Sequence, residues 1–337
     1  MLQKRKKTIL VTGGGGYVGS AVTKYLLQKG YVVRVLDLFI YGKEPLLSLG
    51  KSENLEICKG DIRDEKIVST CLKGVDMVLH MAAIVGAPES ERIPALTWEI
   101  NLDATKRLVA LSKKALVDRF IFVSTCSNYG LIRSGRYADE NSELKPISPY
   151  AESKVAAEKF VLASTGKDFS PVVCRLATVY GVSPRMRFDL LVNQFTRDAY
   201  FRNELVVFGN QGRTFVHMFD VAETFDLLIA APLRKVKDQV YNVGNTKDSN
   251  RTKFELAKIV ERIIPGTRVS LIEKDLDARD YRVNFDKLSN CLGYKTKYRI
   301  EDGVKQLVEY FIMNATVDPY DKKYTNLEKY LDLAKGL

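Results

Sequence analysis

Histidine and paired cysteine are scarce in this sequence. Its 337 residues include two histidines, His80 and His217, which stand too far apart to be a metal-ligand pair. The five cysteines are an odd number and form no CxxC motif, so the sequence predicts neither a disulfide framework nor a zinc site. They are Cys58, Cys71, Cys126, Cys174 and Cys291. We therefore expect no metal centre.

Long apolar runs are also missing. No stretch approaches the roughly 20 residues that a membrane-spanning helix requires. The basic segment Met1–Lys7 is not followed by the apolar region of a secretory signal. These absences predict a soluble cytoplasmic protein without a membrane partner.

Composition bounds the remaining classes. A hydrophobic content of 46% is ample for a sizeable core, in one large α/β unit or two domains. The net charge of +11 is spread among acidic residues through helical stretches. We therefore do not expect nucleic acid as a partner, because nucleic-acid binding needs clustered basic residues. A basic surface suits an anionic small substrate equally well.

A glycine-rich motif follows the first predicted strand and opens a predicted helix over residues 17–28. Gly13, Gly16 and Gly19 allow a tight turn, a close approach by a diphosphate, and packing of the helix on its strand. Asp37 ends the next apolar run, at about the offset where an acid binds the ribose hydroxyls of NAD. Tyr17 and Val18, between the second and third glycines, belong to the same predicted cofactor site. The alternative is an ordinary glycine-rich surface turn.

Two further strand ends are predicted to face the same ligand. Asp61 and Ile62 follow the apolar run over residues 55–58, where Asp61 could meet the adenine amino group, cap a helix beginning near Glu65, or do both. Small residues, Ala82 and Ala83, end the next run and would let a cofactor approach the backbone. His80, inside that run, is interpreted as a core histidine. The regular alternation of strand and helix predicts an α/β fold with a doubly wound parallel sheet.

A catalytic group is predicted after the strand over residues 120–123. Tyr150 and Lys154 are four residues apart on a helix opened by Ser148 and Pro149, so their side chains leave the same face. Beside an ammonium and a nicotinamide ring, the tyrosine would act as a base toward a substrate hydroxyl, to which Thr125 would hydrogen-bond. A YxxxK pair by itself also occurs in surface helices, but its place after the glycine motif favours catalysis.

These motifs together resemble the extended short-chain dehydrogenases/reductases, and within them the nucleotide-sugar epimerase/dehydratase branch. The resemblance implies tightly held NAD, a Rossmann domain over residues 8–180 with a return near 214–245, and a smaller substrate domain over residues 181–337. It also implies a homodimer, formed by helices near Trp98–Leu111 and Pro149–Leu162, unless their apolar faces merely cover the chain's own sheet. The motifs are Thr12–Gly19, Gly60–Ile62, Met81–Ala83, Ser124–Thr125 with Tyr129–Gly130, Pro149–Lys154 and Arg175–Gly181.

The resemblance and the chemistry of guanidinium groups point to a nucleotide-diphospho-sugar as the substrate. Guanidinium groups suit a diphosphate through bidentate contacts, although each could instead form surface salt bridges. The resemblance implies a diphosphate contact for Arg213 and for the arginine of the segment 278–281. The expected substrate residues are Thr125, Cys126, Arg185, Arg187, Asn193, Arg213, Arg279 and Arg282.

One departure from the family narrows the predicted reaction. Where 4,6-dehydratases of this branch carry acidic residues after the threonine, this sequence has Cys126 and Ser127, and the glutamate of the decarboxylases is missing as well. Oxidation at C4 remains, leading to an epimer or to a released keto sugar. Cys126 is interpreted as a buried neutral thiol, with a role as an extra acid or base left open.

The segments over residues 183–193 and 277–282 look most like bacterial enzymes that oxidise GDP-heptoses at C4 for capsule sugars. A catalytically silent relative that binds NAD(H) and senses redox state is the alternative. Intact Thr125, Tyr150 and Lys154 argue against it.

Overall fold

A parallel β-sheet and the helices that cover it form the larger part of the structure. The computed structural model describes residues 6–132, 135–274 and 279–335. Among them, seven strands pair in the order β10-β6-β5-β4-β1-β2-β3, all parallel. The strands are β1 (Thr8–Thr12), β2 (Val32–Asp37), β3 (Leu55–Lys59), β4 (Met77–His80), β5 (Arg119–Thr125), β6 (Ser170–Leu176) and β10 (Gln239–Val243). The predicted doubly wound sheet is confirmed.

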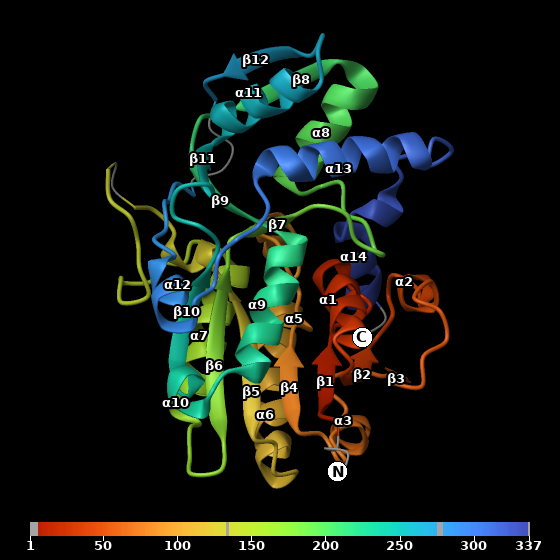
Figure 1. Cartoon of the computed structure of the whole chain (residues 1–337), viewed down its shortest axis with the longest axis vertical. Helices are drawn as coiled ribbons and strands as arrows, with labels where there is room; N and C mark the ends of the chain where they lie inside the picture. Colours follow the sequence, from red (N-terminus) through yellow and green to blue (C-terminus); the bar gives the residue numbers. More distant parts are fainter. Residues whose placement is uncertain (1–5, 133–134, 275–278, 336–337) are drawn as a thin grey trace.

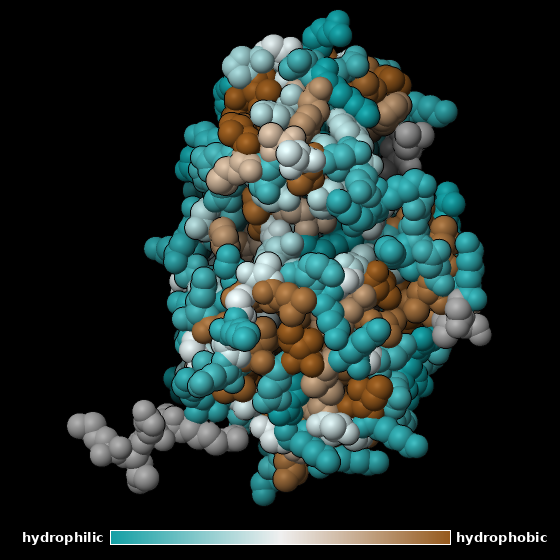
Figure 2. Space-filling view, turned by 90° about the vertical axis from the view of Figure 1, so that its right-hand side faces the viewer, coloured by the Kyte–Doolittle hydropathy of each residue, from teal (hydrophilic) through white to brown (hydrophobic). Residues whose placement is uncertain are grey.

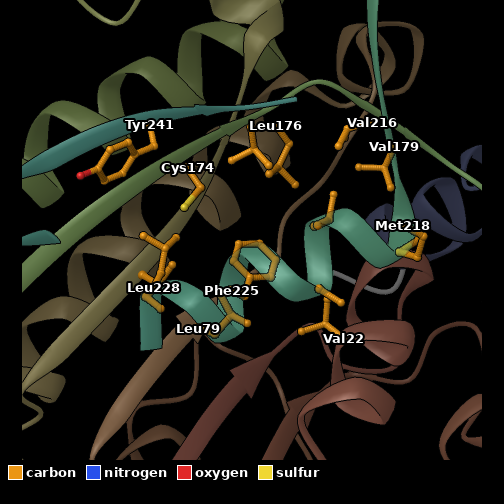
Figure 3. Packing of buried hydrophobic residues seen from close by; sticks show 14 of the residues in the cluster. Val22, Leu79, Cys174, Leu176, Val179, Val216, Met218, Phe225, Leu228 and Tyr241 are labelled. Carbon is orange, nitrogen blue, oxygen red and sulfur yellow. The ribbon is translucent and has the colours of Figure 1, made fainter. Parts of the chain in front are cut away.

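Helices cover both faces of this sheet, which explains why its central strands are apolar throughout. On one face, α1 (Tyr17–Gln28) packs beside α9 (Met218–Ala230). Phe225 and Leu228 of α9 lie against Leu79 of β4 and Cys174 of β6 (Figure 3). The other face carries α3 (Glu65–Cys71), α5 (Pro94–Trp98), a π-helical turn (Glu99–Asp103), α6 (Ala104–Lys114) and α7 (Pro149–Ala163).

A smaller layer stands above the carboxyl ends of the strands (Figure 1). Its core joins β8 to α8, α11 and α13 through buried residues such as Val192, Leu205, Leu256 and Val304. Its elements are α8 (Leu191–Arg202), β8 (Glu204–Phe208), β11 (Asn250–Thr252), α11 (Lys253–Ile263), β12 (Arg268–Ile272) and α13 (Ile300–Met313), beside β7 (Thr178–Tyr180) and β9 (Gly212–His217).

Short helices complete the described chain. They are α2 (Glu44–Leu47), α4 (Ala87–Arg92), a 3-10 turn (Cys126–Tyr129), α10 (Leu233–Val236), α12 (Asp286–Leu292), a second 3-10 turn (Lys322–Tyr324) and α14 (Leu327–Lys335). On the side shown in Figure 2, hydrophilic residues cover most of the surface and hydrophobic ones gather in the middle. Within the described residues, none of the helices has the length and apolarity needed to cross a membrane.

Candidate active site

The glycine motif forms the tight turn between β1 and α1. Gly13 adopts φ of +74°, and a Cβ there would lie 2.7 Å from the backbone nitrogen of Ala82. A Cβ on Gly19 would collide with the carbonyl oxygen of Gly13, so α1 packs closely on the turn only because this position is glycine. The turn therefore leaves backbone exposed to a cleft at the carboxyl edge of the sheet.

Asp37 lies at the end of β2, beside the glycine turn. Its Oδ2 accepts a hydrogen bond from the Gly15 N–H at 2.8 Å, and its Oδ1 accepts one from the Phe39 N–H at 2.6 Å. Burial raises the pKa of this carboxyl, while the two N–H donors act in the opposite direction. The carboxylate is thus fixed beside the glycine turn and keeps lone pairs for ribose hydroxyls.

One pocket joins ten of the twelve predicted cofactor residues, whereas Tyr150 and Lys154 are not among the residues that line it. Its walls include Gly13, Gly16, Tyr17, Val18, Gly19, Asp37, Asp61, Ile62, Ala82 and Ala83. Three buried polar atoms of its lining residues, Tyr41 Oη, Arg185 Nε and Asn326 Oδ1, have no hydrogen-bond partner within the described part of the chain. Buried polar groups normally find a partner, so these atoms fit a polar ligand such as a dinucleotide. The residues present therefore suit NAD.

Asp61 lies in the pocket wall but does not cap a helix. Its carboxylate pairs with Arg63 at 2.6 Å, and Arg63 also reaches Glu99 at 3.2 Å. Burial raises the pKa of Asp61, but the hydrogen bonds from Arg63 outweigh burial and lower it. The alternative of an N-cap is wrong, because Asp64 caps α3 by accepting from the N–H groups of Lys66 and Ile67.

His80 is a core residue, as predicted. Its ring nitrogens bond the hydroxyls of Thr12 at 2.7 Å and Thr105 at 2.8 Å. Burial, followed by the nearby charge of Lys154, lowers its pKa to about 3. The neutral ring therefore joins β1, β4 and α6.

Thr125 and Tyr150 face each other at the carboxyl end of β5. Ser148 caps α7 by accepting from the Ala151 N–H, and Pro149 occupies its first turn, so Tyr150 starts the helix at the sheet edge. Burial raises the pKa of Tyr150 to about 12, against a smaller lowering by the hydroxyl of Thr125. The charge of Arg187, which lines the pocket, also acts to lower the pKa of Tyr150. In the free protein the phenol is protonated.

Lys154 lies one helical turn further along α7 and is buried. Its Nζ stands 4.0 Å from the centre of the Phe122 ring. Burial lowers its pKa to about 7, although Glu158 acts in the opposite direction. A ribose hydroxyl or a phenolate beside this amine would favour its charged form.

A buried ionic network that the sequence motifs did not indicate holds α7 against the sheet. Glu158 binds Arg175 of β6 and accepts a hydrogen bond from Ser124 Oγ at 2.9 Å. Arg175 also donates to Tyr129 Oη at 2.8 Å, and Tyr129 donates to Asn242 at 2.8 Å. The spacing of Glu158 four residues after Lys154 was the available signal. The network fixes Tyr150 and Lys154 relative to Thr125.

Asn101 and Ser90, which were not among the predicted site residues, order the chain that follows β4. Asn101, in the π-helical turn, binds both backbone groups of Ile84 and donates to Ser153 Oγ at 3.0 Å. Ser90 Oγ accepts from the Tyr150 N–H at 3.1 Å. Glu89 beside it is buried, and burial raises its pKa against the opposing charge of Arg187. The loop before α4 is therefore built onto the start of α7.

Cys126 points into the core instead of the cleft. Its Sγ donates to the Arg175 carbonyl oxygen at 3.3 Å, and the residue is 1% exposed. Burial raises the pKa of this thiol, which leaves it neutral. Ser127 lies 3.4 Å from Tyr281, hydroxyl to hydroxyl.

The structure places the predicted arginines in two groups. Arg185 and Arg187 line the cofactor pocket, where Arg187 pairs with Asp189 at 2.6 Å. Arg213 is buried and donates to the carbonyl oxygen of Arg279. Arg282 is exposed in a second pocket, which Asp280 also lines. Residues 277 and 278 of this segment lie outside the described residues.

Asn193, in the first turn of α8, is a structural link. It accepts from the Gly181 N–H at 3.1 Å and donates to Tyr17 Oη at 3.0 Å and to the Arg187 carbonyl oxygen at 2.8 Å. Its amide therefore ties the segment over residues 181–187 to the helix that follows the glycine turn.

A glycine turn, a fixed acid and a Thr-Tyr-Lys group at one sheet edge define a dinucleotide-dependent oxidoreductase of the Rossmann class. The model of the NAD dependent epimerase/dehydratase family matches residues 9–244. The chain belongs to this family of NAD-dependent enzymes that act on nucleotide sugars.

Individual relatives agree with this assignment. The chain is 27% identical to a putative UDP-glucose 4-epimerase of Methanocaldococcus jannaschii, over 91% of this chain and 99% of the relative. It is 29% identical to a dTDP-D-glucose 4,6-dehydratase of Bos taurus, over 91% and 89%. The crystal structure of a dTDP-glucose 4,6-dehydratase from Streptomyces venezuelae with NAD bound is similar with a TM-score of 0.81 and 27% identity, covering 92% and 98%.

Proposed function

We propose that this enzyme oxidises the C4 hydroxyl of a nucleotide-diphospho-sugar. The observation that carries the proposal is the approach of the Thr125 hydroxyl and the Tyr150 phenol at the end of β5, with Lys154 buried beside them. NAD supplies the hydride acceptor in this family. The chain's own residues then have to orient one hydroxyl and remove its proton.

Tyr150 is the proposed base and Thr125 the orienting group. A phenol with a pKa of about 12 does not give up its proton near neutral pH. An ammonium at Lys154 and a positively charged ligand in the pocket would both stabilise the phenolate and lower this pKa. Tyr150 can therefore accept the proton of the sugar hydroxyl only when the cofactor is bound.

The positions after Thr125 argue against elimination of water from the sugar. Elimination needs a second acid and base, yet Cys126 is a buried neutral thiol and Ser127 is a hydroxyl next to Tyr281. The relatives include 4,6-dehydratases, and the family resemblance implies that these positions distinguish this chain from them. The proposed outcome is return of the hydride, giving a 4-epimer, or release of the 4-keto sugar.

The substrate is proposed to lie between the two arginine groups. Arg187 and Arg279 both act electrostatically on Glu89, which lies beside the start of α7. Arg213, Arg279 and Arg282 are proposed to bind the nucleotide diphosphate, and Arg185 and Arg187 lie on the side of the cofactor pocket. This division accompanies the proposed domains, residues 8–180 with a return near 214–245 for NAD, and residues 181–337 mainly for the sugar nucleotide.

A place in bacterial surface-polysaccharide sugar biosynthesis, in the cytoplasm and as a homodimer, completes the proposal. It rests on the resemblance of residues 183–193 and 277–282 to GDP-heptose C4 dehydrogenases. The chain keeps Thr125, Tyr150 and Lys154 together, which favours an active enzyme over a silent NAD(H) sensor.

Mass spectrometry of the products from a panel of GDP-, UDP-, CDP- and dTDP-sugars tests the proposal, with Tyr150→Phe as the control. We expect from wild type, and not from the control, either a product that has lost two hydrogens or an epimer of unchanged mass, which chromatography before the mass measurement separates from the substrate. A product that has lost water would show a dehydratase and contradict the proposal. Absence of any product, with NAD bound, would favour the silent alternative.

A further inference from the structure

The C-terminal helix α14 forms one wall of the cofactor pocket. Figure 1 shows it beside α1 and α2, above the carboxyl ends of β1 and β2. Asn326, Tyr330 and Leu333 line the same pocket as Gly16 and Asp37. The sequence motifs of the cofactor site end more than a hundred residues earlier, so nothing in them points to this helix.

Tyr330 is the most deeply buried contact of this helix with the rest of the chain. Tyr330 is 4% exposed and is the buried residue of α14. Its hydroxyl donates to the Ala83 carbonyl oxygen at 3.4 Å and accepts from the Val85 N–H at 3.4 Å. Its ring meets the ring of Tyr41 edge to face, with centroids 6.3 Å apart. The phenol thus spans the loop after β4 and the loop after β2.

The wall presents polar groups that the protein leaves unsatisfied. In the described part of the chain, Asn326 Oδ1, Arg185 Nε and Tyr41 Oη are buried and have no hydrogen-bond partner. Arg185 is itself tied to the C-terminal segment, because it donates to the Thr325 carbonyl oxygen at 3.1 Å. A guanidinium donor, an amide acceptor and a phenol suit the phosphates and ribose hydroxyls of a dinucleotide.

The hydrogen bonds of Tyr330 are weak enough for α14 to move away from the pocket. The hydrogen bonds of Tyr330 lie at 3.3 to 3.4 Å, which is long for such bonds. The other residues of α14 are half-buried or exposed. The helix is short, and besides Tyr330 it packs on the core of the sheet through the partly buried side chains of Leu331, Leu333 and Ala334, so opening it uncovers few apolar groups.

We propose that α14 is a lid that closes over NAD, with Asn326, Tyr330 and Arg185 as cofactor-binding residues on its side of the pocket. The dinucleotide enters and leaves only when Tyr330 withdraws from Ala83 and Val85. The enzyme therefore retains NAD between turnovers, because NAD can dissociate only after α14 has moved away. The proposal concerns NAD alone and holds whichever sugar the enzyme oxidises.

Dissociation of NADH, followed by its fluorescence after mixing with excess NAD in the absence of any sugar, tests the lid. The variants are Tyr330→Ala, Tyr330→Phe, a chain ending at Thr325, and Lys329→Ala as a control exposed on the same helix. We expect at least about tenfold faster dissociation for Tyr330→Ala and for the shortened chain, since most affinity changes appear in the off-rate. Tyr330→Phe, which keeps the ring, should fall between these and wild type, and Lys329→Ala should match wild type.

Two results would overturn the lid. In one, the shortened chain releases NADH at the wild-type rate. In the other, it binds NADH faster with unchanged release, which would mean that α14 excludes the cofactor instead of holding it. Because no sugar is present, neither result depends on the proposed C4 oxidation, and failure of that oxidation leaves these rates unchanged. Tyr330→Phe guards against misfolding, since it preserves the packing of the ring.

Discussion

Replacing Arg175 by methionine should destabilise the protein more than any surface substitution. The side chains of Arg175 and Glu158 are 5% and 3% exposed, so the change leaves a buried carboxylate with Ser124 as its remaining partner. Removing one partner of a buried ion pair typically costs about 3–5 kcal/mol. Tyr129 loses its donor as well. The free energy of unfolding, measured in urea, should fall by an amount in this range.

An exposed pair on the same chain gives the matched control. Arg262 is 68% exposed and pairs with Glu301 at 2.9 Å, so Arg262→Ala should cost at most about 1 kcal/mol. The double variant Arg175→Met with Glu158→Leu should recover most of the loss, because it no longer buries an unpaired charge. The reasoning is refuted if Arg175→Met costs no more than Arg262→Ala, or if the double variant is no more stable than the single one.

Three further expectations concern the cofactor, proton linkage and assembly. Asp37 should repel a 2′-phosphate, so calorimetry should find tighter binding of NAD than of NADP, and equal affinities would contradict this role. Burial lowers the pKa of Lys154 to about 7, whereas a lysine in the unfolded chain titrates near about 10.4. Between these values the unfolded chain binds more protons, so the free energy of unfolding should rise with pH, and Lys154→Met should flatten that rise; identical slopes would rule it out. Light scattering at micromolar concentration should report a dimer built on α6 and α7, and a monomer would mean that their apolar faces only cover the sheet.

Local signals in the sequence were sufficient for the elements that build the site. The glycine turn, the helix over residues 17–28 and the Ser148–Pro149 start of α7 agree with the prediction, because capping and turn chemistry depend on adjacent residues. The alternative of an N-cap at Asp61 was wrong because two acids stand three residues apart, and only the structure shows that Asp64 faces the helix start while Asp61 turns to Arg63.

Long-range contacts could not be predicted in the same way. The pairing of Glu158 with Arg175 joins a helix to a strand, and no periodicity encodes the partner of a buried charge. The five arginines looked alike in sequence, yet the fold sends Arg185 toward the cofactor pocket and Arg213 toward Arg279. The position of α14 beside the cofactor pocket could not be predicted either, because a short amphipathic pattern indicates a helix but not the surface on which it packs.

Hydride transfer from a sugar deuterated at C4 tests the central claim most directly. In a single turnover, quenched before product release, the account predicts deuterium on the reduced nicotinamide. It also predicts that Tyr150→Phe slows the transfer by about 10²- to 10⁴-fold while NAD and sugar nucleotide still bind. Deuterium lost to solvent, or an unchanged rate in Tyr150→Phe, would contradict C4 oxidation with Tyr150 as the base.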